Sequence, residues 1–375
     1  MARAPALQEI EELPEADRLD GFPHPRATQR LYGHEVAERM LATAFASGRM
    51  HHGWLIAGAD GIGKATLAYR FARYVLADPA ERHPDTLEVA PETHAARQVL
   101  ALSHPGLLVI RRAWDPKGKR FPATIPVDEV RRLKAFLGRT MDDDAWRVVI
   151  VDRAEELNVS AANALLKSLE EPPPRTVFLL VSSAPGRLLV TIRSRVRTLD
   201  LTALADEPLR RAVTQAFAAG GDDVTAAAPA PSEWERLARL ADGSVRRLLS
   251  LHAAQGLALH DRISAILSGL PAVDWGAAHA LGDELSGQAA DQRYELFFEL
   301  LMGAIARLVE AAARGTGPSG EAALAARLIG PARLASWAGL WERVAADKAE
   351  TAALNLDRKA LILDVVSRLE AASRP

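Results

Sequence analysis

This sequence contains no cysteine, no apolar run long enough to cross a membrane and no large excess of either charge. The absence of cysteine excludes disulfide bonds and cysteine-ligated zinc, and it fits a reducing compartment. The formal net charge of −2 over 375 residues excludes an overall basic surface, so any contact with DNA would come from a local patch or from partners. Because the N-terminus is acidic rather than signal-like, we expect a cytoplasmic protein.

The length allows two or three domains, and 25% charged with 49% hydrophobic residues is typical of a globular protein. Residues 1–25 are rich in proline and acidic groups, which indicates a loose arm. From there to about residue 201, short apolar runs alternate with helical patterns, and this alternation predicts an α/β domain with a parallel sheet. Residues 78–104 interrupt it and are expected to form a surface insertion. Beyond residue 201 the chain is alanine-rich and helical almost throughout.

A phosphate-binding loop is the clearest motif. An apolar run ending at Ala57 leads into GADGIGKAT, Gly58 to Thr66, and then into a helical pattern. Strand, glycine loop, lysine and helix in this order form a P-loop, in which backbone N–H groups, the helix N-terminus and Lys64 attract phosphate oxygens. A chance glycine-rich turn is the alternative. The candidate nucleotide-binding residues in the loop are Gly58, Gly61, Gly63, Lys64 and Thr66.

The loop departs from its pattern where the metal is usually bound. A serine or threonine should follow the lysine and offer its hydroxyl to Mg²⁺, but the chain has Ala65 there. Thr66 comes one position late, and one residue turns a side chain by about 100° around a helix. The site is therefore expected to hold phosphates and to handle a metal ion poorly.

A second acidic signal follows the apolar run RVVIVD, which ends at Asp152. An acid at the carboxyl end of a buried parallel strand lies where ligands bind in open α/β sheets, and in P-loop proteins such an acid holds Mg²⁺. The next residue is Arg153, where an ATPase commonly needs a carboxylate to orient water. The alternative is an aspartate that caps the next segment.

Two further stretches follow. Ser160 is predicted to cap a helix that carries NALLKSLEEPP, Asn163 to Pro173, and Val177 to Ser183 is predicted to be a buried strand ending in two hydroxyls. Arginines then alternate at 193, 195 and 197, and in an extended segment all three would share one face. A solvated edge is the alternative explanation for these arginines.

Together, GADGIGKAT, VVIVD, NALLKSLEEPP and the Ser194-Arg195-Val196 triplet resemble the AAA+ clamp-loader subunits of bacterial DNA polymerase III. The third motif is the most specific, and the triplet is similar to the family's Ser-Arg-Cys motif. The degraded nucleotide site is similar to the delta-prime branch rather than to the tau/gamma motor subunits. The resemblance implies an AAA+ module (residues 1–201), a small helical lid (202–254) and an all-helical collar (255–375) that joins subunits into a ring.

The resemblance also implies roles for single residues. Lys64 takes the position of the phosphate lysine and Asp152 that of the Walker B acid. Ser182 or Ser183 takes the sensor 1 position and Arg246 that of the sensor 2 arginine. Arg195 takes the arginine finger, which reaches into a neighbour's ATP site.

The expected function is therefore accessory. The chain would help to load the sliding β clamp onto primer-template DNA, in a hetero-pentameric ring with tau/gamma and delta subunits. Its own ATPase activity is expected to be weak or absent, with ATP or ADP in a degenerate site and no zinc. The alternative is a self-sufficient P-loop ATPase such as the tau/gamma motor, and the net charge speaks against a DNA-binding module that acts alone.

Overall fold

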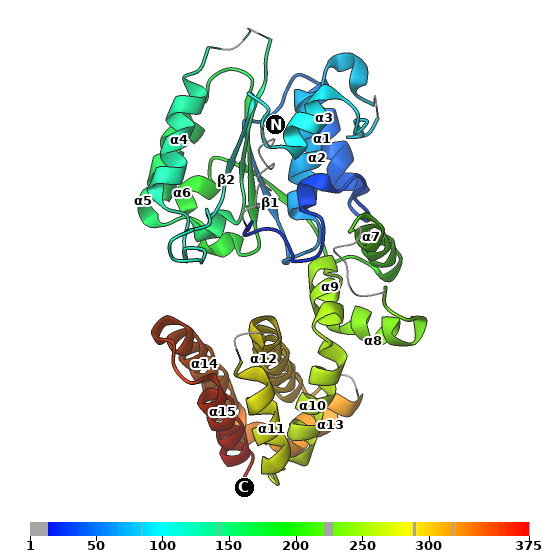
Figure 1. The fold of residues 1–375 in the computed structure, drawn as a ribbon, viewed down its shortest axis with the longest axis vertical. Coiled ribbons are helices and arrows are strands. Elements are labelled where there is room, and N and C mark those ends of the chain that lie inside the picture. Colours follow the sequence, from blue (N-terminus) through cyan, green and yellow to red (C-terminus); the bar gives the residue numbers. More distant parts are fainter. Residues whose placement is uncertain are drawn as a thin grey trace, which may run out of the picture. The chain divides into compact units, whose positions relative to one another are not determined.

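The computed structural model describes residues 14–83, 85–140, 142, 144–220, 228–287, 290–316 and 319–374. The chain divides into two compact units, Met1–Leu248 and Leu249–Pro375. All strands of the described residues lie in the first unit (Figure 1). The predicted division into module, lid and collar is finer than this two-way split and stays a prediction.

The first unit is built on a parallel sheet. Its strands are β1 (Gly53–Ala57), β2 (Leu107–Ile110), β3 (Arg147–Val151), β4 (Thr176–Ser182) and β5 (Arg197–Asp200), in the order β2-β3-β4-β1-β5. Along β3, Val148 and Ile150 enter one core cluster and Val149 and Val151 the other, because successive side chains of a strand point to opposite faces. A strand that is apolar on both faces suits a sheet that is covered on both sides.

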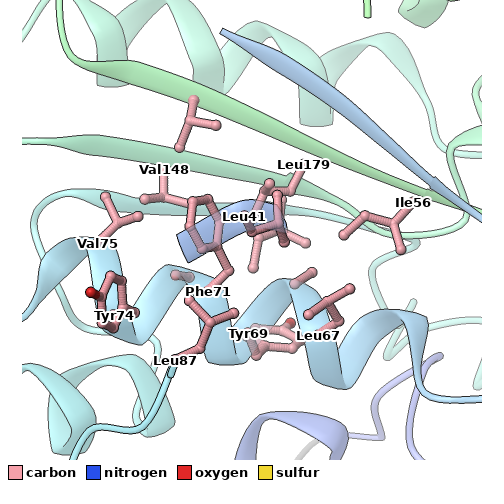
Figure 2. Packing of buried hydrophobic residues seen from close by; sticks show 14 of the residues in the cluster. Leu41, Ile56, Leu67, Tyr69, Phe71, Tyr74, Val75, Leu87, Val148 and Leu179 are labelled. Atoms are coloured by element: carbon pink, nitrogen blue, oxygen red, sulfur yellow. The ribbon is translucent and has the colours of Figure 1, made fainter. Parts of the chain in front are cut away.

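Helices cover both faces of this sheet. The first face packs against α1 (Glu35–Ala46), α2 (Lys64–Leu76) and α3 (His94–Leu100), and the second against α4 (Val127–Leu137), α5 (Val159–Glu170) and α6 (Val190–Arg193) (Figure 1). Figure 2 shows the core under α2, where Leu67 and Phe71 lie with Ile56, Val148 and Leu179. The three-layer α/β arrangement confirms the predicted fold class, and α2 begins directly at the phosphate loop.

Three helices follow the sheet, α7 (Asp206–Ala219), α8 (Pro231–Ala241) and α9 (Val245–Ala253), and the last crosses the boundary between the units. The indole Nε1 of Trp234 donates to Asp206 Oδ1 at 2.7 Å and ties α8 to α7. The backbone N–H of Leu204 donates to the carbonyl of Gly243 at 3.1 Å, so the turn before α9 is held at the end of the sheet domain.

The second unit is entirely helical in its described residues. Its helices pack around buried side chains that include Trp337, Phe297 and Phe298. The indole of Trp337 also donates to the carbonyl of Ala372 at 3.3 Å and joins two helices. No helix in the described part of the chain has the length and apolarity needed to span a bilayer. The helices are α10 (Gly256–Gly269), α11 (Trp275–Leu285), α12 (Asp291–Arg314), α13 (Ser319–Leu328), α14 (Gly330–Leu354) and α15 (Arg358–Ser373).

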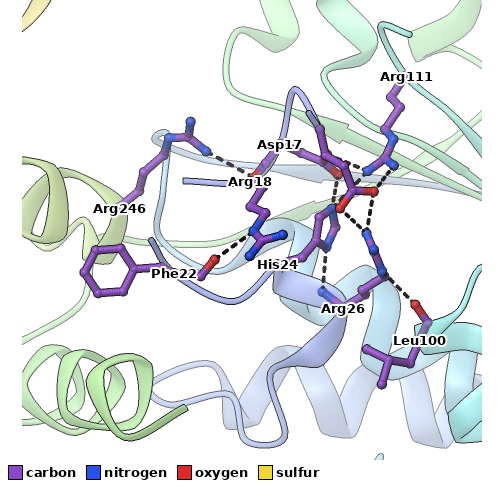
Figure 3. A network of polar contacts seen from close by, with 9 residues as sticks. Asp17, Arg18, Phe22, His24, Arg26, Leu100, Arg111 and Arg246 are labelled. Atoms are coloured by element: carbon purple, nitrogen blue, oxygen red, sulfur yellow. Dashed lines mark hydrogen bonds and ion pairs between the residues drawn. The ribbon is translucent and has the colours of Figure 1, made fainter. Parts of the chain in front are cut away.

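The prediction of a loose N-terminal arm is wrong for residues 14–25, and residues 1–13 lie outside the described part. Residues 14–30, which we call the N-terminal strap, lie against the first unit and bury Asp17, Phe22 and His24 to 4–6% exposure. The strap holds polar groups in the interior because they pair with one another and with the sheet domain (Figure 3).

Three other local predictions need correction. Residues 78–104 are not a surface insertion, because Leu87 and Val89 enter the core and α3 packs on α2. The cap of α5 is Asn158 rather than Ser160, since the Asn158 side chain accepts from the N–H of Ala161 at 2.8 Å. The arginines at 193, 195 and 197 do not share an extended face, because the first ends α6 and the last begins β5.

Candidate functional site

The phosphate loop lies between the carboxyl end of β1 and the first turn of α2. Its glycines adopt backbone angles that side chains disfavour, with φ of 73° at Gly61 and 110° at Gly63. A Cβ on Gly61 would lie 2.4 Å from Ser244 Oγ and from the Cβ of Arg246. Glycine is therefore needed here both for the turn and for the close approach of α9.

Lys64 begins α2 and is only 4% exposed. Its ammonium donates to the carbonyl of Ala59 within the loop and to Ser183 Oγ at 2.9 Å, beyond the end of β4. Burial lowers the pKa of Lys64, and the nearby charges of Asp60, Glu155 and Asp152 oppose that shift. Of the two predicted sensor hydroxyls, Ser183 is therefore the one that accepts from Lys64. Ser182 is fully buried, and its Oγ accepts from the backbone N–H of Ala184 at 3.2 Å.

Asp152 follows β3 at the same edge of the sheet and is 6% exposed. Its pKa is raised to about 7, first by burial and then by the negative charge of Asp17, although Arg153 and Arg111 act in the opposite direction. The acid that was predicted to bind Mg²⁺ therefore sits where its charged form is disfavoured.

Arg153 turns toward the phosphate loop instead of away from it. Its backbone lies in the left-handed region, with φ of 49°, and its Nη2 lies 3.2 and 3.1 Å from the two carboxylate oxygens of Asp60. A weaker ion pair joins it to Glu156 at 3.7 Å. An arginine thus occupies the place in which a carboxylate was expected, and its guanidinium is fixed to the loop.

Glu155 is a site residue that sequence reasoning missed. Its Oε1 accepts from the backbone N–H of Ser183 at 2.9 Å, and its charge acts on Lys64. The one sequence signal for Glu155 is that it follows Asp152 by three residues. That spacing places Glu155 at the site only when the conformation of the turn after β3 is known. The site therefore keeps a carboxylate beside Ser183, although not at the expected position.

Arg246, in the first turn of α9, lies over the loop. Its backbone N–H donates to the carbonyl of Gly61 at 3.3 Å, and its guanidinium donates to the carbonyl of Asp17 at 3.1 Å (Figure 3). The predicted sensor arginine is thus close to the phosphate loop, and in this structure its side chain is bound to the N-terminal strap.

Arg195 lies away from these residues, in the turn between α6 and β5. Its guanidinium pairs with Glu170, the last residue of α5, at 2.7 Å and donates to the carbonyl of Thr191 at 2.8 Å. The side chain is 35% exposed. The fold supplies this carboxylate from a residue that precedes Arg195 by 25 positions in the sequence.

The loop fits a nucleotide's phosphates better than it fits a metal. The glycine backbone and Lys64 match a polyphosphate, whereas position 65 lacks a hydroxyl and Thr66 is only 9% exposed within α2. Among the described residues, no group of three or more His, Cys, Asp or Glu side chains is arranged to hold a metal ion. The residues present do not fit Mg²⁺.

Comparison with known proteins relates the chain to replication proteins. A family described as "DNA polymerase III, delta subunit" matches residues 33–205. The DNA polymerase III subunit delta' of Escherichia coli strain K12 is 30% identical over 335 residues, which cover 88% of this chain and 92% of that relative.

Two other relatives match a smaller share of their own length. The subunit delta' of Pseudomonas aeruginosa is 41% identical over 144 residues, 38% of this chain and 41% of that relative. The subunit tau of Escherichia coli strain K12 is 28% identical over 348 residues, 90% of this chain and 47% of that relative. This chain thus spans less than half of either of these two relatives.

Proposed function

Because this chain belongs to the family of DNA polymerase III delta' subunits, we propose that it serves as a stator-like subunit of a clamp loader in DNA replication. It assembles with tau/gamma and delta subunits into a hetero-pentameric ring in the cytoplasm. The ring places the sliding β clamp on primer-template DNA, and the neighbouring subunits hydrolyse the ATP. This chain contributes Arg195 to one neighbour's ATP site.

The position of Arg195 relative to the sheet is the main support for this proposal. Strands β1 and β5 are parallel, and Trp54 pairs with Arg197 while Ala57 pairs with Asp200. Arg195 therefore precedes β5 at the amino edge, whereas the phosphate loop follows β1 at the carboxyl edge. A strand of this length separates the two edges by roughly 10 to 15 Å. Arg195 is thus badly placed for its own loop and well placed for a neighbour's.

Glu170 and Thr191 position the guanidinium of Arg195 without burying it. The carboxylate accepts one edge of the fork at 2.7 Å and the carbonyl accepts from Nη1 at 2.8 Å, which restricts the side chain before any partner arrives. A planar guanidinium at a subunit edge can meet two phosphoryl oxygens at once, and charge on these oxygens increases as the bond breaks. ATP in the neighbouring subunit supplies the phosphoryl group, and this chain supplies the charge that stabilises it.

The test compares Arg195→Ala with Arg193→Ala, a matched loss of charge two residues away on an exposed position. We expect the Arg195→Ala chain to fold and to enter the complex. The complex should lose the ATPase and clamp-loading contribution of one neighbouring site, since such fingers are worth roughly 10³ to 10⁵ in rate. Arg195→Lys should not restore it, because an ammonium lacks the planar fork. Clamp loading at the wild-type rate by the assembled Arg195→Ala complex would exclude the assignment.

The competing function is a motor of the tau/gamma type, to which the chain is also similar over most of its length. A motor needs a hydroxyl at position 65 and a carboxylate at position 153, and the chain has Ala65 and Arg153. The delta' role is therefore the better supported of the two.

A further inference from the structure

Two cations, Lys64 and Arg153, are held at the phosphate loop by contacts with the protein. The loop lacks the hydroxyl at position 65 that usually binds Mg²⁺. Lys64 is bound to the loop and to Ser183, and Arg153 is bound to Asp60 within the loop. Neither cation belongs to a flexible surface chain, since Lys64 is 4% exposed and the Arg153 side chain 28%. In a metal-dependent P-loop the second positive charge beside the lysine would be Mg²⁺.

We propose that this loop binds the polyphosphate of a nucleotide without Mg²⁺, with Arg153 in the place of the metal as the second cation. The inference rests on the nucleotide site of the proposed function and adds its mode of recognition. Arginine suits this task because its fork donates two parallel hydrogen bonds to phosphate oxygens, and because it stays charged at every pH of interest. A metal ion would meet repulsion from this guanidinium.

Asp60 holds Arg153 in the position from which it would bind phosphate. Both of its carboxylate oxygens lie 3.1–3.2 Å from Nη2, so the guanidinium is directed at the loop before a ligand arrives. The Asp60 side chain is 53% exposed, and ion pairs that are open to solvent contribute little to stability. A polyphosphate, which carries more charge than one carboxylate, can therefore displace Asp60 from Arg153.

The acidic groups of the site set a limit on this binding. Asp60 and Glu155 both act on Lys64, and Asp60 would lie close to an incoming phosphate. Removal of the charge at Asp60 should therefore strengthen metal-free binding, whereas removal of Arg153 should weaken it. This pair of opposite effects distinguishes a cation that binds phosphate from one that only neutralises Asp60.

The experiment measures ATP binding to the full-length chain by equilibrium dialysis in excess EDTA and again in Mg²⁺. We expect the wild type to bind ATP in EDTA and to gain nothing from Mg²⁺. Arg153→Ala should weaken binding in EDTA by about tenfold or more, the range for a lost charge-assisted hydrogen bond. Arg131→Ala, which removes a 70% exposed arginine from α4, is the matched control and should bind like the wild type. Asp60→Asn should bind more tightly.

A second experiment restores the residues that usually bind Mg²⁺, so that the test of metal-free binding does not depend on Arg153→Ala alone. Ala65→Ser combined with Arg153→Glu returns a hydroxyl and a carboxylate, and ATP binding by this chain should depend on Mg²⁺. Thermal melts without ligand establish that each variant is folded, and Arg153→Lys, with the charge but not the fork, should fall between wild type and alanine.

Three results would overturn the inference: no ATP binding in EDTA at millimolar concentration, binding that appears only with Mg²⁺, or equal binding by wild type and Arg153→Ala. None of these results bears on the clamp-loader role, because that role is tested through Arg195 in the assembled complex. The two proposals can therefore fail separately.

Discussion

The buried carboxyl groups of Asp17 and Asp152 have pKa values that are shifted in opposite directions. Burial pushes the pKa of Asp17 upward, but a hydrogen bond with His24 at 2.8 Å and the positive charge of Arg111 outweigh it and lower the value to about 2. Asp152 receives less compensation, and burial together with the charge of Asp17 raises its pKa to about 7. The strap thus holds its own acid ionised and makes ionisation of the site acid harder.

The raised pKa of Asp152 predicts a stability cost that grows with pH. The ordinary value is 3.8, so between about pH 4 and about pH 7 the folded chain retains a proton that the unfolded chain has released. Stability contributed by this group therefore falls as pH rises through that window. Asp152→Asn should stabilise the protein more at pH 8 than at pH 5, by on the order of 2 to 3 kcal/mol. Urea unfolding of both chains at both pH values measures it, and an equal effect at the two pH values would contradict the assignment.

Asp17 makes the opposite contribution. Its pKa lies near 2 in the fold, below its ordinary value of 3.8, so its stabilising pairing is present above about pH 4 and is lost as pH falls toward 2. The charge of His24 contributes to the low pKa of Asp17, although burial lowers the pKa of His24 itself and its Nδ1 accepts from the backbone N–H of Arg26 at 3.0 Å.

The isolated chain should hydrolyse ATP slowly or not at all. Position 65 offers no hydroxyl to Mg²⁺, and Arg153 replaces the carboxylate that usually orients water. Glu155 lies beside Ser183, but no described group completes a metal site with it. Steady-state assays with Mg²⁺ measure this, and a turnover on the order of 1 s⁻¹, typical of working enzymes, would disprove it.

At the scale of elements, the N-terminal strap joins parts of the first unit that the sequence separates by more than 180 residues. Phe22 contacts the ring of Phe217 in α7 edge-on at a centroid distance of 5.3 Å. Gln215 accepts from the N–H of Arg30 at 3.3 Å and donates to its carbonyl at 3.0 Å. Arg246 in α9 donates to the carbonyl of Asp17 (Figure 3). The strap contacts therefore hold α7 and the start of α9 to the sheet domain.

Removal of the Phe22 ring, which contacts Phe217, should destabilise α7 locally while the sheet keeps its stability. Phe22 is 5% exposed, and Phe22→Ala should cost on the order of 3 kcal/mol locally by removal of its ring from the interface with α7. We expect faster amide exchange in α7 and the strap, with unchanged protection in β1, β3 and β4. Gln29→Ala, on an exposed part of the strap, is the control. Exchange that rises equally in the strands would mean that the substitution destabilises the whole unit.

At the scale of the whole molecule, the two units carry different kinds of residues. The phosphate loop, Asp152 and Arg195 all lie in the first unit. The second unit buries several large apolar side chains, among them Trp337 and Phe297, in its own interior. Its described residues contain no group of three or more His, Cys, Asp or Glu side chains that could hold a metal ion. We therefore expect the second unit to serve assembly rather than chemistry.

Removal of residues 249–375 should abolish entry into the complex. The first unit has its own two core clusters, so the shortened chain should keep the far-ultraviolet circular dichroism of an α/β protein. Gel filtration with tau/gamma and delta subunits should then show it as a separate species, whereas the full-length chain co-elutes with them. Undiminished assembly of a folded, shortened chain would assign the contacts to the first unit instead.

The sequence by itself determined the features that depend on neighbouring residues. The glycines of the phosphate loop, the β-branched run before Asp152 and the helical periodicities act over one turn or one strand. They predicted β1, β3 and β4 within a residue or a few, and a helix directly after the phosphate loop. The four motifs also predicted the family. The roles of the individual site residues stay predictions, and the sequence had no means to place Arg195 at the edge opposite the loop.

Only the tertiary structure decided which distant residues meet. Lys64 with Ser183, Arg153 with Asp60, and Arg195 with Glu170 are pairs from different elements, and the strand order β2-β3-β4-β1-β5 brings them together. The strap is the clearest case, because a proline-rich acidic stretch has the composition of a loose arm and becomes ordered through Arg111 and Arg246. Charges compensate one another across space, so the partner of a buried acid cannot be found until the chain has folded.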